Sequence, residues 1–368
     1  MNILSSKNLF RILFLVCFIS TANAQQNAMQ YMSAANAKVA KAGALKSKWQ
    51  TPTSGPELQK KKKIVYVARE YSDAGTAGVF NGMKEALAGT TWQLLFIDCR
   101  GYCQGPRIVK QALDMGAEGI VLAGVEITEM GDGLAQAKKA GVPIVGWHVS
   151  SKPGPVPGIF TNVTNDAKEA AQIAALFGVT ESNSNKAGIV VITDTSTSYL
   201  AAKSSAIVET LKQCEVCKIL SVEDLPLHET RKKFPSVIEG LVKRFGSKWT
   251  HVIAINDIYF DLMGREEIKK LIAANHLRGI SAGDGSATAY QRIRQNELQV
   301  GSIPEPVHMQ GWQIVDELNR AFAKEAPSGM SSPIHLVSKQ NLGYDGGSKD
   351  TFDPANDYRT KYAAYWKK

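Results

Sequence analysis

The sequence lacks the residue patterns that mark the common catalytic sites. It has no GxSxG turn, no P-loop and no HExxH motif, which are the signatures of serine hydrolases, nucleotide triphosphatases and zinc peptidases. Gly101 and Gly105 do not have the GxGxxG spacing of a dinucleotide site. Only six histidines occur among 368 residues, and none is spaced for metal binding. We therefore expect a protein that is not an enzyme and that uses no cofactor or metal ion.

Long apolar runs are missing after the first 24 residues. Residues 1–24 contain Lys7 and Arg11, an apolar run over residues 12–19 and the small-residue pattern Ala22-Asn23-Ala24. This is typical of a secretory signal peptide, which we expect to be cleaved after Ala24. A membrane anchor is the alternative, but the run is far shorter than the ~20 residues that span a bilayer. We expect an exported protein without membrane insertion.

The positive charge is confined to the beginning of the chain. Of the net charge of +9, the signal segment contributes two units and residues 25–63 contribute seven, so residues 64–368 are neutral. A nucleic-acid-binding fold needs a basic face of its own, and we expect no nucleic-acid partner. We interpret the Ala/Lys-rich extension 25–63, with a helix around residues 32–45, as a spacer or as a helix packed outside the fold.

Four cysteines remain after processing, in two close pairs. Cys99 is near Cys103, and Cys214 is near Cys217. Export favours local disulfides within each pair. Free thiols, or a metal or redox role for the CxxC spacing, are the alternatives.

From residue 64 onward, short β-branched apolar runs alternate with segments of helical periodicity. Such alternation is typical of βαβ units in a parallel sheet that is covered on both faces. The expected strands are 64–68, 94–97, 119–122, 143–147, 159–162, 189–192, 218–221, 251–255 and 279–282, with a last βα unit over 299–322. A proline-rich stretch, 153–158, interrupts the series midway. We therefore predict an α/β fold with two doubly wound, Rossmann-like lobes rather than one TIM barrel.

Polar side chains follow the predicted strands, at the edge where open α/β sheets bind ligands. Carboxylates and carboxamides can hydrogen-bond hydroxyl groups, and aromatic rings offer flat apolar faces. The candidates for one shared ligand-binding cleft are Arg69, Glu70, Tyr71, Asp73, Trp147, His148, Tyr199, Asn256, Asp284 and Glu305. Asn256-Asp257 and Asp284-Gly285 are the most prominent pairs. Simpler roles remain open for them, because Asn and Asp favour helix N-caps and Asp-Gly favours turns. Trp147 is equally compatible with a core position.

Several motifs resemble those of the type 1 periplasmic substrate-binding proteins, the ribose-binding-protein-like group that serves ABC transporters. The most specific are Ala254-Ile255-Asn256-Asp257, Gly283-Asp284-Gly285 and residues 301–306, Gly-Ser-Ile-Pro-Glu-Pro. The resemblance covers residues 64–368. It implies two lobes joined by a three-segment hinge near Asn162, Glu305 and residues 335–340. The N-terminal lobe would comprise 64–162 and 306–336, and the C-terminal lobe 163–305 and 337–368.

The same resemblance implies a set of ligand contacts. Those contacts fall on Arg69, Asp73, Gly75, Thr76, Ala123, His148, Tyr199, Asn256, Asp284 and Glu305. Asn256 and Asp284 keep the sugar-binding type. His148-Val149 replaces the Asp-Arg pair of the family, Gly75-Thr76 replaces an aromatic pair, and Glu305 replaces a glutamine. The scaffold is thus retained while the pocket is altered.

These features together predict a periplasmic, monomeric binding protein. It would capture a small polar ligand, a sugar or sugar-like solute first of all, and deliver it to a membrane ABC transporter permease. An amine-bearing ligand is the alternative that the acidic side chains raise. A periplasmic sensor for a chemoreceptor or histidine kinase, and a cleft enzyme such as a glycosidase, are the alternative functions.

Overall fold

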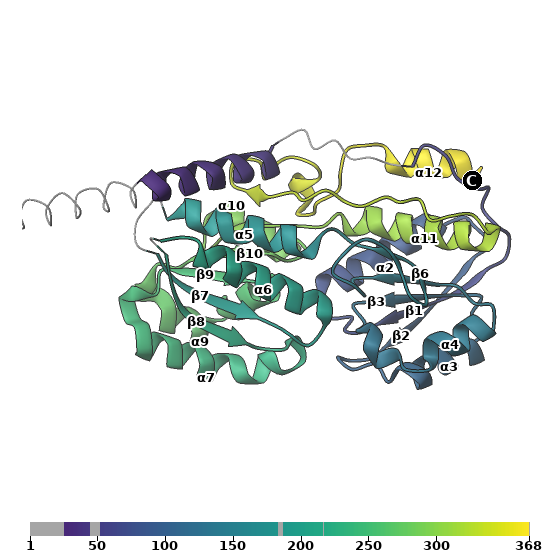
Figure 1. Ribbon diagram of the computed structural model, residues 1–368, viewed down its shortest axis with the longest axis horizontal. Coiled ribbons are helices and arrows are strands. Elements are labelled where there is room, and N and C mark those ends of the chain that lie inside the picture. Colours follow the sequence, from purple (N-terminus) through teal and green to yellow (C-terminus); the bar gives the residue numbers. More distant parts are fainter. Residues whose placement is uncertain (1–25, 45–51, 183–186, 216, 368) are drawn as a thin grey trace, which may run out of the picture.

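The computed structural model describes residues 26–44, 52–182, 187–215 and 217–367. These residues form two lobes, each built on a six-stranded sheet with helices on its faces (Figure 1). The two open sheets confirm the predicted α/β class with two doubly wound lobes and exclude a single barrel. The predicted signal peptide lies outside the described residues. Within the described ranges, no helix combines the length and the apolar character that crossing a membrane requires.

The first lobe has the strand order β2-β1-β3-β4-β6-β5 and is parallel except at β5. Its strands are β1 (Lys63–Ala68), β2 (Gln93–Asp98), β3 (Gly119–Ala123), β4 (Ile144–Trp147), β5 (Gly154–Val156) and β6 (Ile159–Val163). Its helices are α2 (Ala74–Leu87), α3 (Gly105–Asp114), α4 (Gly133–Lys139), α11 (Val307–Ala323) and α12 (Tyr358–Trp366). The proline-rich stretch that interrupts the sequence pattern forms β5, an antiparallel edge strand, which is where a sheet tolerates proline.

The second lobe has the strand order β12-β11-β10-β9-β7-β8 and is parallel except at β12. Its strands are β7 (Ala187–Thr193), β8 (Cys217–Asp224), β9 (His251–Ala254), β10 (Arg278–Ser281), β11 (Gln299–Ser302) and β12 (Val337–Ser338). Its helices are α5 (Ala167–Glu181), α6 (Ser198–Lys212), α7 (Leu227–Phe245), α8 (Ile258–Met263), α9 (Glu266–Ile272) and α10 (Ala287–Gln295).

Strand β1 shows why the apolar runs are continuous rather than alternating. Ile64 and Tyr66 belong to the core that the sheet shares with α2 and α11, whereas Val65 and Val67 belong to the core shared with α3 and α4. Successive side chains point to opposite faces of a strand, so a sheet covered on both faces needs apolar residues at every position. This arrangement leaves the carboxyl ends of the strands as the place where polar side chains gather.

The C-terminal segment differs from the expected division of the chain. β12 pairs with β11 in the second lobe, but α12 packs against α11 in the first lobe. Tyr358, Tyr362 and Trp366 recur at helical spacing and form one apolar stripe, which lies in the same core as Trp312 of α11. Leu342 and Phe352 still pack with Tyr290 and Ile293 of α10, so the chain returns to the first lobe only after residue 352, and residues 358–366 do not belong to the C-terminal lobe.

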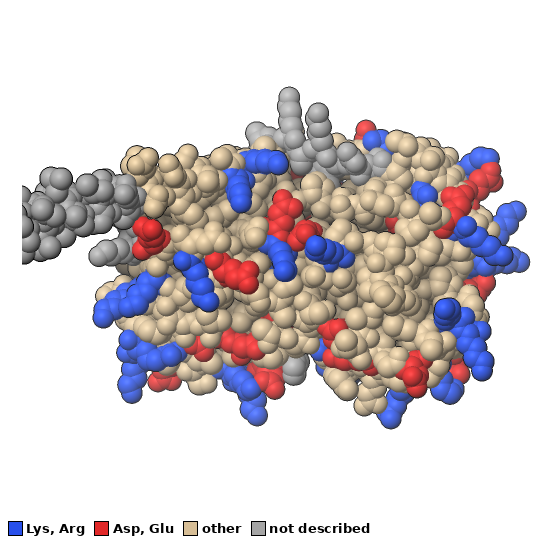
Figure 2. Space-filling model, viewed as in Figure 1, with Lys and Arg blue, Asp and Glu red and all other residues tan. Residues whose placement is uncertain are grey.

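The extension before residue 63 contacts both lobes. Residues 26–42 form a helix on the second lobe, where the hydroxyl of Tyr31 donates to the carbonyl of Thr210 at 3.1 Å. Residues 52–62 lie on the first lobe, where the Asn319 amide donates to the Pro56 carbonyl at 2.9 Å. On the face that Figure 2 shows, basic and acidic side chains are interspersed, as the neutral body of the chain implies.

Both cysteine pairs are disulfide-bonded. Cys99 and Cys103 bridge the loop between β2 and α3, and Cys214 and Cys217 bridge the loop between α6 and β8. Neither disulfide lies among the residues that line the cleft between the lobes.

Candidate functional site

The polar ends of the strands converge on a cleft between the two lobes. The first lobe contributes side chains after β1, β3 and β4, and the second contributes side chains after β9, β10 and the start of α6. They enclose an inner chamber of about 60 Å³. It is lined by Arg69, Glu70, Asp73, Thr76, Gly124, Trp147, His148, Thr197, Tyr199, Leu200, Lys203, Leu227, Ile255, Asn256 and Asp284.

Asn256 connects the two lobes at this chamber. Its amide nitrogen donates to Asp73 Oδ1 of the first lobe at 3.2 Å and to Asp284 Oδ2 of the second lobe at 3.4 Å. Asp73 is also the N-cap of α2, accepting from the Thr76 backbone N–H at 2.8 Å. Gly75 makes this approach possible, because a Cβ at that position would lie 2.3 Å from Asp284 Oδ2. One neutral amide thus separates two buried carboxyl groups.

Burial raises the pKa of Asp284 well above its usual range, and the negative charge of Asp73 raises it further. Near neutral pH, ionisation of Asp284 therefore lowers the free energy of unfolding of the protein.

Three rings form a stack across the cleft. The His148 ring lies 3.6 Å from the Trp147 ring and 4.0 Å from the Tyr199 ring, at interplanar angles of 17° and 16°. His148 has a φ of +56°, a conformation that is uncommon for residues other than glycine, and this backbone folds the imidazole back onto its neighbour. Trp147 and His148 belong to the first lobe and Tyr199 to the second, so the stack spans both.

Glu305 contacts two of the stacked rings and has three polar neighbours. It accepts hydrogen bonds from Tyr199 Oη at 3.0 Å and Gln310 Nε2 at 2.7 Å, and His148 Nε2 lies 3.0 Å from its Oε1. Burial alone would raise the pKa of Glu305, but the charge of His148 and its contact with the carboxylate outweigh burial and lower that pKa to about 2. Burial lowers the pKa of His148 itself, against the opposing effect of Glu305. We conclude that Glu305 is a firmly ionised anchor.

The position of Glu305 leads to a prediction about pH. Its pKa in the folded protein lies below its ordinary value of 4.5, so its ionised form stabilises the fold above pH 4.5 and this contribution is lost as the pH falls toward 2. A shift of this size corresponds to about 3 kcal/mol at ~1.36 kcal/mol per pKa unit. Glu305→Gln should therefore be less stable than the wild type by about that amount at pH 6, and the difference should narrow below pH 4.5.

Urea unfolding of both proteins between pH 6 and pH 2 measures this difference. Glu239→Gln, on the exposed side of α7, is the matched control and should show a small difference at every pH. A constant gap between the wild type and Glu305→Gln over the whole pH range would contradict the assigned role.

Three predicted contacts are placed differently from the rest. Arg69 lines the chamber, but its guanidinium is held by both carboxylate oxygens of Glu129, at 2.9 and 3.0 Å. Arg69 therefore does not neutralise the acidic groups of the cleft. Glu70 accepts from the hydroxyl of Ser72 at 2.7 Å. Tyr71 packs against Phe80 and Phe96 and does not line the cavity.

Two residues that contact the predicted site were not among the sequence-based candidates. Lys203 is only 2% exposed, donates to the Ala282 carbonyl at 2.7 Å and lies 4.8 Å from the centre of the Tyr199 ring. Its spacing of four residues from Tyr199 on one helix could have indicated a shared face. Gln310 links Trp147 Nε1, at 2.9 Å, to Glu305, and α11 carries no local signal for this role.

Within the described residues, one group has the spacing of metal ligands. The donor atoms of His148, Asp284 and Glu305 lie within 4.8 Å of one another. The positive charge of Lys203 acts on all three groups, lowering the pKa of each. Lys203 thus supplies positive charge to the three groups that could otherwise hold a metal ion.

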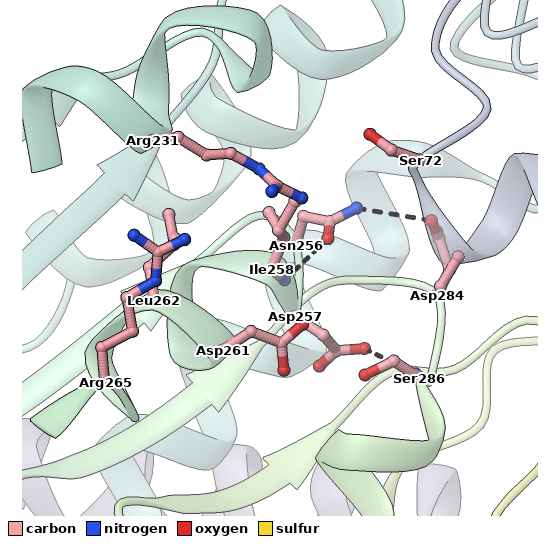
Figure 3. Close-up of a pocket in the computed structure, with 11 residues that line it drawn as sticks. Ser72, Arg231, Asn256, Asp257, Ile258, Asp261, Leu262, Arg265, Asp284 and Ser286 are labelled. Atoms are coloured by element: carbon pink, nitrogen blue, oxygen red, sulfur yellow. Dashed lines mark hydrogen bonds between the residues drawn. The ribbon is translucent and has the colours of Figure 1, made fainter.

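A second, outer chamber of about 160 Å³ adjoins the inner one (Figure 3). The two chambers share Asn256 and Asp284 in their walls. The remaining lining residues are Ser72, Ala74, Arg231, Asp257, Ile258, Asp261, Leu262, Arg265 and Ser286.

Asp257 has a structural role in this wall. Its carboxylate accepts from the backbone N–H groups of Gly285 and Ser286, from the Gln299 amide and from the Ser302 hydroxyl. Asp257 occupies the N-cap position of α8 without a side-chain capping bond, and Asn256 Oδ1 accepts from the Ile258 N–H at 3.0 Å instead. Asp257 fixes the loop that carries Asp284.

Known proteins support the two-lobed architecture. The periplasmic binding protein domain model matches residues 64–326. A solved sugar ABC transporter protein from Yersinia enterocolitica is 14% identical with a TM-score of 0.69, covering 84% of this chain and 95% of its own. A galactofuranose binding protein is 18% identical with a TM-score of 0.64, covering 78% and 97%.

The periplasmic binding protein of an arabinose ABC transporter from Shewanella sp. ANA-3 is also similar. It is 15% identical with a TM-score of 0.64, covering 82% of this chain and 97% of its own. At these identities the likeness concerns the fold. No curated protein shows significant sequence similarity to the chain. The family match extends over most of the chain, from β1 through α11, and the chain therefore belongs to the periplasmic binding protein domain family.

Proposed function

We propose that this protein captures a small polar solute, sugar-like in its hydroxyl groups, by closure of its two lobes. The observation that carries the proposal is the contact of Asn256 with Asp73 across the cleft, because polar groups from opposite lobes meet at one chamber. A solute that contacts both lobes stabilises the closed arrangement, since it binds that arrangement better than an open one. The exported protein would then deliver its solute to an ABC transporter in the membrane.

Thermal unfolding with a panel of pentoses, hexoses and polyols tests this proposal. A solute at 100 times its Kd should add about 2.7 kcal/mol of stability, and the solute should be recovered chemically unchanged. Chemical conversion of a bound solute would favour a cleft enzyme instead. The absence of stabilisation by any solute in a wide panel, amines and acids included, would contradict solute capture.

A further inference from the structure

The charges around the two chambers are distributed unevenly. Asp73 of the first lobe and Asp284 of the second lobe share the neutral amide of Asn256 as their common donor. Among the described residues, no lysine or arginine forms an ion pair with either carboxylate. The nearby cations are engaged elsewhere: Arg69 is bound to Glu129, and Lys203 to the Ala282 carbonyl. The charge of Lys203 still acts on Asp284, so two carboxyl groups here face a single lysine ammonium group that forms no ion pair with either of them.

The opposite wall of the outer chamber carries positive side chains that form no ion pair with the described residues. Arg231 of α7 and Arg265, which precedes α9, both line the chamber, and neither forms an ion pair within the described part of the chain. In Figure 3 the Arg231 guanidinium lies beside Asn256, opposite Ser72 and Asp284.

The two aspartates that line the outer chamber with these arginines have other partners. Asp257 accepts four hydrogen bonds from its own lobe. Asp261 accepts from Thr288 Oγ1 at 2.7 Å and from Arg292 Nη1 at 2.6 Å. The two arginines therefore remain free to bind an anionic group from outside the chain.

We infer that the solute is zwitterionic, with an ammonium group against Asp284 and Asp73 and a carboxylate or similar acidic group against Arg231 and Arg265. The inference rests on the proposed function and specifies its ligand class. An ammonium group between two carboxylates removes their mutual repulsion, and each of its N–H donors can reach a carboxylate oxygen. The outer chamber has room for roughly five water molecules at ~30 Å³ each, enough for the body of a small solute.

Matched solutes separate the contribution of each charge. One series shares a six-carbon polyol skeleton. Glucose carries no charged group, glucosamine carries an amine, gluconate carries a carboxylate, and glucosaminate carries both. A second series is shorter: ethanol, ethanolamine, 3-hydroxypropionate and serine. We expect calorimetry to show, in at least one series, that the doubly charged member binds about tenfold or more tighter than either singly charged member.

Variants then assign each charge to its wall. Asp284→Asn should weaken the doubly charged solute by about tenfold while changing the singly acidic solute little. The double variant Arg231→Gln with Arg265→Gln should also weaken the doubly charged solute by about tenfold, while changing the solute that carries only the amine little. Asp114→Asn and Arg107→Gln, exposed on α3 outside the cleft, are the matched controls. Thermal unfolding of each variant establishes that it is folded.

The outcomes distinguish this inference from the proposed function. If a neutral or singly charged solute binds as tightly as its doubly charged counterpart, or if no doubly charged solute binds, the zwitterion inference is wrong while solute capture stands. If no solute of any charge binds, solute capture itself fails.

Discussion

Replacing Asn256 by alanine should weaken solute binding by about 10- to 100-fold, equivalent to about 1.4–2.8 kcal/mol. The variant removes the amide that donates to both Asp73 and Asp284, so two buried carboxyl groups face each other without a donor between them. The variant also loses the contact between the lobes that the Asn256 amide makes with Asp73, so the closed arrangement that holds the solute is less stable. Calorimetry with the solute identified for the wild type measures the effect.

Asn275→Ala is the matched control for this variant. Asn275 donates to the carbonyls of Gly246 and Trp249, outside the cleft, so its loss should reduce stability without changing affinity. Equal affinities of Asn256→Ala and the wild type would remove Asn256 from the site.

Replacing Trp366 by alanine should cost about 3–5 kcal/mol of stability, the usual range for a buried tryptophan. Trp366 is 2% exposed, stacks on Trp312 at 5.6 Å and donates from Nε1 to Asp316 Oδ1 at 3.0 Å. The loss leaves a cavity beneath α12 and an acceptor without its donor. Urea unfolding measures this loss.

Trp366→Phe keeps one aromatic ring but removes the N–H donor and the second ring of the indole. It should cost about 1–3 kcal/mol, less than the alanine variant. A loss below 1 kcal/mol for Trp366→Ala would show that α12 is not an integral part of the first lobe.

The fold could be predicted from the sequence because its signals are local. Apolar runs such as residues 64–68 and 189–192 form fully buried strands, as a sheet covered on both faces requires. The helix α12 was assigned to the C-terminal lobe but packs on the first lobe, since the stripe of Tyr358, Tyr362 and Trp366 indicates that it packs on an apolar surface but not on which lobe.

The site could be predicted in part, and the misses have a common cause. Asp284 and Asn256 follow strands, so the topology of a parallel sheet places them at the cleft. Tyr71 also follows a strand, but its loop turns the ring toward Phe80 and Phe96. Lys203 and Arg231 come from helices, and their part in the cleft depends on how the lobes face each other, which no local pattern encodes.

Mass spectrometry of the protein purified from its source tests solute capture most directly. Under native conditions we expect a one-to-one complex with a small polar solute, and after denaturation the same solute should be released with its structure intact. Prolonged incubation should leave that solute unchanged, because the proposed function is capture without chemical conversion. A solute that is converted during incubation, or a protein that carries no solute and binds none from the panels above, would contradict the function proposed for this cleft.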